Sequence, residues 1–246
     1  MFRKILQPFY TAYALATFLI GFFITFPFYL VIGMRNTAGA RKTIYNIVKG
    51  WAKVWLFING MPLKIIGKSP APGRYVVVAN HISYLDTVNL FPALPSFFRA
   101  LGKKEFSKIP LIGFLYKQIA IMVDRSSTES RAKSMRLMWR VLKREADIII
   151  FPEGTFNETG QPLKEFYNGA FRLAIDTQTP LLPVIFPDTC ARWHYSAWWK
   201  LWPGKNRAIY LPPISVTGMA MDDVPLLKKE VYTLMGAALE KYRTLP

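Results

Sequence analysis

The chain contains two histidines, and one of them, His81, is followed five residues later by Asp86. Histidine can take up or release a proton near neutral pH, and a carboxylate beside it can orient the ring and stabilise its charged form. Such a dyad can deprotonate a hydroxyl group. No Ser or Cys in a nucleophile-elbow setting accompanies the pair, so the pattern favours direct attack by a substrate hydroxyl. The alternative is a structural histidine, with Asn80 or Ser83 capping the helix that follows.

The dyad follows a short apolar run at residues 75–79, which predicts a buried strand with His81 just beyond its end. Strand ends in α/β proteins are where side chains reach a ligand crevice. Similar runs predict strands at residues 63–66, 97–101, 119–123, 147–151, 181–186 and 208–211. Helices are predicted at residues 86–91, 169–178 and 224–242, and from a capping box at 126–129 to about residue 145.

This alternation predicts an α/β fold with a mostly parallel central sheet flanked by helices. The strand at residues 147–151 is almost continuously apolar, which predicts a central position. Pro183 predicts that the strand at residues 181–186 lies at an edge of the sheet or ends there.

The composition favours a membrane surface as a partner. The 246 residues suit one α/β domain with an appendage, and they are 52% hydrophobic with a net charge of +17. This combination favours an anionic membrane over nucleic acid, because nucleic-acid binders rarely expose so much apolar surface. The single cysteine, Cys190, excludes an intrachain disulfide framework and fits a reducing compartment. No Cys and His residues have zinc-site spacing, so no metal is expected.

The first 61 residues form a predicted membrane unit ahead of an α/β domain at residues 62–246. Residues 5–34 carry no charge and are long enough to span a bilayer, although Pro27 could bend the helix back within one leaflet. A cleaved signal peptide is the alternative, but the apolar run is long for one. Residues 41–61 predict an amphipathic interfacial helix with its tryptophans at headgroup depth, or alternatively an ordinary core helix.

Three later segments also suit a membrane or lipid role. Residues 192–205 hold four of the seven tryptophans, which is typical of an interfacial loop, with a packed hydrophobic lid as the alternative. The helix predicted near residue 130 has a basic face. This face is either exposed to solvent, or binds anionic headgroups or an acidic acyl donor. That face consists of Lys133, Arg136, Arg140 and Arg144. The apolar connector at residues 109–115 either lines an acyl-chain groove or begins a buried helix.

Four blocks of the sequence, taken in order, resemble the glycerolipid acyltransferases, and among them the 1-acyl-sn-glycerol-3-phosphate acyltransferases. The first is Asn80-His81, four residues, and Asp86. The second runs from Gly-Lys-Lys-Glu at residues 102–105 to Val-Asp-Arg at residues 123–125. The third is Phe-Pro-Glu-Gly-Thr at residues 151–155, and the fourth is the proline-containing strand at residues 180–184. Each block is short, and their order and spacing make the resemblance specific.

The resemblance implies transfer of an acyl group from acyl-CoA or acyl carrier protein to the 2-hydroxyl of lysophosphatidate, giving phosphatidate without an acyl-enzyme or a cofactor. His81 would be the general base, Asp86 would orient it, and backbone N–H groups near this box would hold the oxyanion. Substrate-binding roles carry over to the matching residues Lys104, Arg125, Glu153, Gly154 and Thr155. A membrane-embedded two-helix motif at the N-terminus is implied as well. We expect a bacterial inner membrane, with the active site at its cytoplasmic face.

One position departs from the family pattern. The third block of the family usually continues Glu-Gly-Thr-Arg, and that Arg is a candidate ligand for the acceptor phosphate, but this chain has Phe156 there. Lys164, Arg172 or Arg125 could supply the missing cation. A lyso-lipid with another headgroup, such as lyso-ornithine lipid or a phospholipid in remodelling, is therefore an alternative acceptor, and a CoA-independent transacylase shares the same box. A non-catalytic membrane-surface binder is the alternative from a different class.

Overall fold

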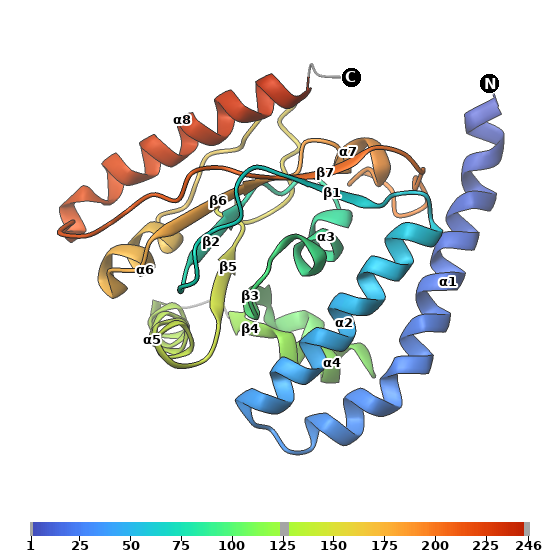
Figure 1. Ribbon diagram of the computed structural model, residues 1–246, viewed down its shortest axis with the longest axis horizontal. Coiled ribbons are helices and arrows are strands. Elements are labelled where there is room, and N and C mark those ends of the chain that lie inside the picture. Colours follow the sequence, from blue (N-terminus) through green and yellow to red (C-terminus); the bar gives the residue numbers. More distant parts are fainter. Residues whose placement is uncertain (1, 124–127, 244–246) are drawn as a thin grey trace.

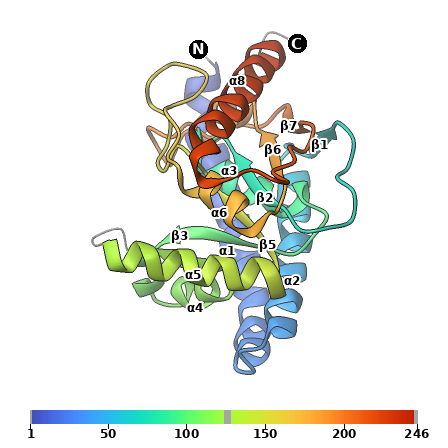
Figure 2. The same cartoon turned by 90° about the vertical axis from the view of Figure 1, so that its left-hand side faces the viewer.

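The computed structural model describes residues 2–123 and 128–243, which form three layers (Figure 1). A central sheet is covered on one face by α5 (Thr128–Arg144), α6 (Gly169–Thr177) and α8 (Val224–Arg243), the layer that faces the viewer in Figure 2. On the other face α3 (Leu85–Ala93) lies against the sheet, with α2 (Ala38–Ile58) and α1 (Phe2–Gly33) successively further out. The remaining short helices are η1 (Lys104–Lys108), α4 (Ile112–Ile119), α7 (Thr189–Arg192) and η2 (Met221–Asp223).

The sheet has seven strands in the order β1-β7-β6-β2-β5-β3-β4. Their bounds are β1 Leu63–Ile66, β2 Val76–Ala79, β3 Phe98–Lys103, β4 Ala120–Val123, β5 Asp147–Ile150, β6 Leu181–Ile185 and β7 Asn206–Tyr210. Five neighbouring strands, β6, β2, β5, β3 and β4, are parallel, whereas β7 runs antiparallel to β6 and carries β1 parallel to itself. The predicted mostly parallel α/β sheet is thus confirmed.

The central strands β2 and β5 are apolar along their whole length because of their position in the sheet. All four residues of β2 and all four of β5 are buried, because helices cover both faces of the sheet. Each buried Val or Ile contributes about 1.5–3 kcal/mol relative to an exposed position. The carboxyl ends of the five parallel strands lie at one edge of the sheet, so the residues that follow β2, β5 and β6 are brought together there.

The expectation for Pro183 is wrong, because β6 lies inside the sheet between β2 and β7. Pro183 pairs in register with Val78 of β2, and its carbonyl, which accepts from the N–H of Leu211, faces β7. The missing N–H therefore also faces β7. Pairing there is irregular, since the bridges Val184–Tyr210 and Leu181–Ile214 leave two residues of β6 opposite three. A bulge of this kind tolerates a proline inside a sheet.

Among the described residues, one helix, α1, is long and apolar enough to cross a membrane, with a mean hydropathy of 2.2 over Ile5–Gly33. Its helix continues through Pro27. One side of it bears exposed apolar side chains, among them Ile5, Phe9, Ile20, Phe23, Ile24, Phe28 and Val31. The division of the chain between residues 61 and 62 stays a prediction.

α2 packs between α1 and α3, so part of its apolar side is buried within the protein. Trp55 is 1% exposed, and its indole N–H donates to the carbonyl of Ala14 on α1 at 2.9 Å. Trp55 is therefore covered by α1 and is not an exposed interfacial side chain. Ile44 and Trp55 are used here for helix–helix packing, which has the same spacing, whereas Ile58 is exposed, and the interfacial placement of the helix stays a prediction.

Gly21 provides a test of the contact between α1 and α2. A Cβ atom at Gly21 would lie 1.9 Å from the indole ring of Trp51, whereas a Cβ at Gly50 on α2 would meet no atom within 4 Å. We expect Gly21→Ala to displace Trp51 and destabilise the protein by about 1–3 kcal/mol. Gly50→Ala, the matched control, should stabilise its helix by about 0.5–1 kcal/mol. Thermal unfolding in detergent measures both changes, and equal midpoints for the two variants would contradict the close approach.

Candidate active site

The Asp86 carboxylate is buried and saturated with hydrogen-bond donors. Its Oδ2 accepts from the backbone N–H groups of Ile82 at 2.7 Å and Ser83 at 2.8 Å, and from the His81 ring, with Nδ1 at 3.0 Å. Its Oδ1 accepts from the hydroxyl of Thr189 at 2.6 Å. Asp86 also lies in the first turn of α3, where the helix dipole favours a negative charge. These donors together compensate for the burial of the carboxylate.

This arrangement determines which nitrogen of His81 is available for chemistry. A carboxylate only accepts hydrogen bonds, so Nδ1 must carry the proton that faces Asp86. The neutral ring then has its lone pair on Nε2. The side chain is 16% exposed, so the ring is largely enclosed but remains accessible. A histidine oriented in this way can act as a general base.

Aromatic rings enclose the His81 imidazole. Phe151, directly after β5, stacks on it with ring centroids 4.0 Å apart and an interplanar angle of 13°. Phe156 lies at 4.4 Å and is itself packed edge-on against Tyr84 at 4.9 Å. Phe156 thus occupies a place beside the reactive ring.

Glu153 is fully buried and holds the backbone of the site instead of pointing into solvent. Its Oε1 accepts from the N–H of His81 at 2.7 Å, and its Oε2 accepts from the N–H of Lys164 at 2.9 Å. Burial, as the largest cause, raises the pKa of Glu153 to about 7, although both hydrogen bonds favour the charged form. Gly154 then adopts a φ of 74°, which turns the chain back toward the site.

The other predicted substrate-binding residues have separate positions. Thr155 is exposed, and its hydroxyl accepts from the ammonium of Lys164 at 2.9 Å. Lys104 begins η1 at the carboxyl end of β3, at the same edge as His81, with β5 between β3 and β2. Arg125, together with the predicted capping box at residues 126–129, involves residues outside the described part of the chain. The roles predicted for all these residues stay predictions.

Five backbone N–H groups within the box have hydrogen-bond acceptors in the protein itself. The N–H groups of His81, Ile82 and Ser83 are bound by the carboxylates of Glu153 and Asp86. The N–H of Leu85 is bound by the Ser83 hydroxyl, and that of Asp86 by the Ser83 carbonyl. These five groups already have acceptors in this structure, three of them the buried carboxylates and two of them Ser83, and the oxyanion donors near the box stay a prediction.

Sequence reasoning did not single out Thr189 and Asp188, which support the site from the end of β6. Thr189 is fully buried and donates to Asp86 across 103 residues of chain. The neighbouring Asp188 accepts two hydrogen bonds of 2.7 Å from the guanidinium of Arg207 on β7. The side-chain amide of Asn80 also binds this segment: its Nδ2 donates to the carbonyl of Phe186, and its Oδ1 accepts from the N–H of Phe186. The parallel topology could indicate that the residues after β6 lie at the same edge of the sheet as the dyad. No sequence spacing identifies Thr189 as the partner of Asp86.

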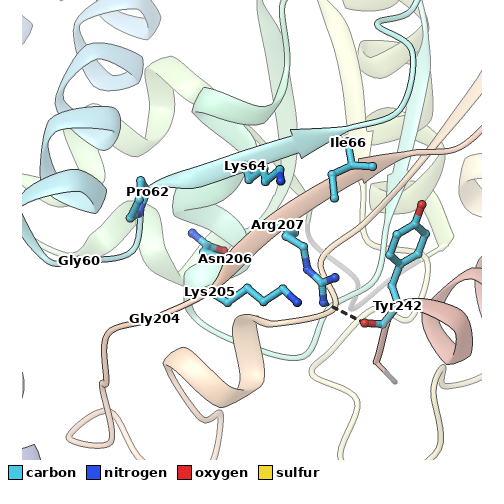
Figure 3. A pocket seen from close by; sticks show the side chains of 9 residues that line it. All are labelled: Gly60, Pro62, Lys64, Ile66, Gly204, Lys205, Asn206, Arg207 and Tyr242. Atoms are coloured by element: carbon cyan, nitrogen blue, oxygen red, sulfur yellow. Dashed lines mark hydrogen bonds between the residues drawn. The ribbon is translucent and has the colours of Figure 1, made fainter. Parts of the chain in front are cut away.

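A hollow of about 710 Å³ lies beside β1 and β7 and is separated from β2 by β6 (Figure 3). It is lined by Gly60, Pro62, Lys64, Ile66, Gly204, Lys205, Asn206, Arg207 and Tyr242. Its most buried cation, Arg207, is already paired with Asp188 and donates to the carbonyl of Tyr242 at 2.8 Å. Neither His81 nor Asp86 lines this hollow.

The comparisons with known proteins identify a family. The family model described as Acyltransferase matches residues 62–187, which include the dyad and the turn at Glu153. The 1-acyl-sn-glycerol-3-phosphate acyltransferase of Limnanthes douglasii is 30% identical over 183 residues, covering 74% of this chain and 64% of the relative. The alpha enzyme of Mus musculus is 30% identical over 179 residues, covering 71% of this chain and 62% of the relative. The match thus spans a little less than two thirds of these relatives.

The fold has a close counterpart among solved structures. The crystal structure of the 1-acyl-sn-glycerophosphate (LPA) acyltransferase PlsC from Thermotoga maritima superposes with a TM-score of 0.82. The superposition covers 99% of both chains at 23% sequence identity. This similarity establishes that the whole described architecture, including α1 and α2, is a known arrangement.

The pKa of Glu153 predicts how stability depends on pH. The folded protein binds the Glu153 proton more tightly than the unfolded chain does, where the pKa is near 4.5. The stability that this proton binding gives to the folded protein is fully present below about pH 4.5. The free energy of unfolding then falls by about 3 kcal/mol as the pH rises through about 7. We expect the thermal midpoint in detergent to fall between pH 5 and pH 8, and to fall less in Glu153→Gln. Glu158→Gln, at an exposed carboxylate, should keep the wild-type slope; an unchanged slope in Glu153→Gln would contradict the assignment.

Proposed function

Since the chain belongs to the Acyltransferase family, we propose that it transfers an acyl group to the 2-hydroxyl of lysophosphatidate and forms phosphatidate. The observation that carries the proposal is the oriented dyad: Asp86 holds Nδ1 of His81, and within the described chain no protein group hydrogen-bonds Nε2. The names of the plant and mouse relatives, both 1-acyl-sn-glycerol-3-phosphate acyltransferases, support the choice of acceptor. The donor we propose is a thioester, acyl-CoA or acyl carrier protein.

In the proposed reaction, Nε2 of His81 takes the proton of the acceptor hydroxyl as its oxygen attacks the thioester carbonyl. Asp86 stabilises the imidazolium that forms, because its carboxylate stays charged and keeps its hydrogen bond to Nδ1. The tetrahedral intermediate then expels the thiolate, which receives the proton from Nε2. The ester bond forms, the thioester bond breaks, and His81 returns to its neutral state.

Direct transfer fits the surroundings of His81 better than an acyl-enzyme. Cys190 is the only cysteine of the chain. Burial first, and then the charge of Asp86, raises the pKa of its thiol, which disfavours the thiolate that a nucleophile requires. The Ser83 hydroxyl is bonded to the carbonyl of Trp193 and to the N–H of Leu85. Neither group is placed as an activated nucleophile.

We also place the protein at a membrane, with the active site at the cytoplasmic face of a bacterial inner membrane, where the acyl donor would be soluble. The support is the exposed apolar side of α1, together with Trp198 and Trp199, which are 57% and 52% exposed. The loop that bears these tryptophans packs against α1, since the hydroxyl of Thr11 donates to the carbonyl of Trp199 at 2.8 Å. Their exposed rings suit the interfacial region.

An acceptor with another headgroup is the second candidate, and Phe156 favours it. Its ring packs beside His81 at the position where an arginine would offer a charge to a phosphate. A panel of lysophosphatidate, lysophosphatidylglycerol and lyso-ornithine lipid distinguishes the two candidates. Product that requires His81 and forms from a different acceptor alone would replace lysophosphatidate as the substrate.

Removal of the proposed base provides the direct test. We expect His81→Ala to lower the rate of acyl transfer by about 10²–10⁴-fold, because no other described group can take the proton at this point. The control is His194→Ala, since the ring of His194 hydrogen-bonds to Ser196 within its own loop. Radiolabelled acyl-CoA and lysophosphatidate give the rates, and circular dichroism checks that both variants fold. Wild-type turnover in His81→Ala would refute the mechanism.

Membrane attachment should depend on apolar burial more than on charge. We expect the protein to stay with membranes in 1 M salt and to be released by detergent, because salt screens charges but does not reverse the transfer of apolar surface. Ile20→Asp with Ile24→Asp, both on the exposed side of α1, should shift protein to the soluble fraction. Sedimentation after salt or detergent washes measures this, and complete release by salt would contradict insertion of α1.

A further inference from the structure

Lys164 lies next to the dyad although it is 83 residues away in the chain. One carboxylate, that of Glu153, bridges the backbone N–H groups of His81 and Lys164. The Lys164 backbone is therefore fixed relative to His81 by a buried group. Burial raises the pKa of Glu153, and the positive charge of the Lys164 side chain partly opposes that rise.

The side chain of Lys164 reaches back to the turn beside His81. Its ammonium donates to the exposed hydroxyl of Thr155 at 2.9 Å, and Thr155 precedes Phe156, whose ring contacts that of His81. An ammonium has three donors, and this contact uses one of them. Within the described chain Lys164 forms no ion pair with a carboxylate, so its charge is not neutralised by a partner there.

We propose that Lys164 and the hydroxyl of Thr155 form the binding site for the phosphate of the acceptor. The ammonium supplies the charge that Phe156 cannot, and the hydroxyl adds a second donor beside it. The inference rests on the proposed function, because a phosphomonoester next to an attacking hydroxyl is what lysophosphatidate presents. Phe156 then has a separate task, which is to pack against the His81 ring and exclude water from it.

The test compares an acceptor that has the phosphate with one that lacks it. Wild type, Lys164→Gln, Lys164→Arg and Thr155→Val are assayed with lysophosphatidate and with monoacylglycerol, using the same labelled acyl-CoA. Lys229→Gln, at an exposed lysine of α8, is the matched control for loss of one positive charge.

We expect Lys164→Gln to lower kcat/KM for lysophosphatidate about 10–100-fold, mainly through KM, because it removes a charge-assisted hydrogen bond. Transfer to monoacylglycerol should change less than about threefold, and Lys164→Arg should recover most of the activity, since it restores the charge. Thr155→Val should show a smaller loss that is also confined to lysophosphatidate, and Lys229→Gln should match the wild type.

Two results would overturn the proposal: an unchanged kcat/KM in Lys164→Gln, or an equal loss with both acceptors that Lys164→Arg fails to recover, which would mean a structural role. Failure of the proposed function itself is visible separately. In that case the wild-type protein forms no His81-dependent product from lysophosphatidate, whatever residue stands at position 164.

Discussion

A buried carboxylate that must be surrounded by donors is the constraint on which the site depends. Asp86 is completely enclosed, and a charge in that position is tolerated only when hydrogen bonds replace the lost water. Its donors come from the backbone that follows His81, from the His81 ring, and from Thr189 at the end of β6. The turn between β2 and α3 therefore has one conformation in which all these donors converge, and the orientation of the His81 ring follows from it.

Glu153 is a second buried carboxylate that accepts hydrogen bonds from the protein around His81. It fixes the His81 backbone, while Asp86 fixes the His81 ring, so two carboxylates from two different strand ends determine the position of one imidazole. Phe151 and Phe156 complete the enclosure and limit the water around the ring. The parallel arrangement of β2, β5 and β6 makes this possible, because it brings the loops after these strands to one edge of the sheet.

Local patterns in the sequence predict the parts of this structure that local physics determines. The β-branched run before His81 predicts a buried strand, and the spacing of His81 and Asp86 predicts their contact, because a turn of five residues can close on itself. Thr189 has no such signal, since its contact to Asp86 exists only through the order of the strands. Pro183 and Trp55 show the opposite case. Pro183 lies inside the sheet because a bulge beside it removes the need for its N–H. Trp55 is buried because α1, which is distant in sequence, covers it.

The bond between Thr189 and Asp86 also sets an order of events during synthesis, when a chain emerges from its N-terminus. α1 precedes the strands in the chain, so it leaves the ribosome while the α/β sheet is still incomplete. His81 and Asp86 emerge next, but the hydroxyl that completes the carboxylate shell is encoded 103 residues later. The hydrogen-bond shell of Asp86, which orients the His81 ring, is thus complete only once β6 has joined the sheet, after α1 and the dyad have both emerged.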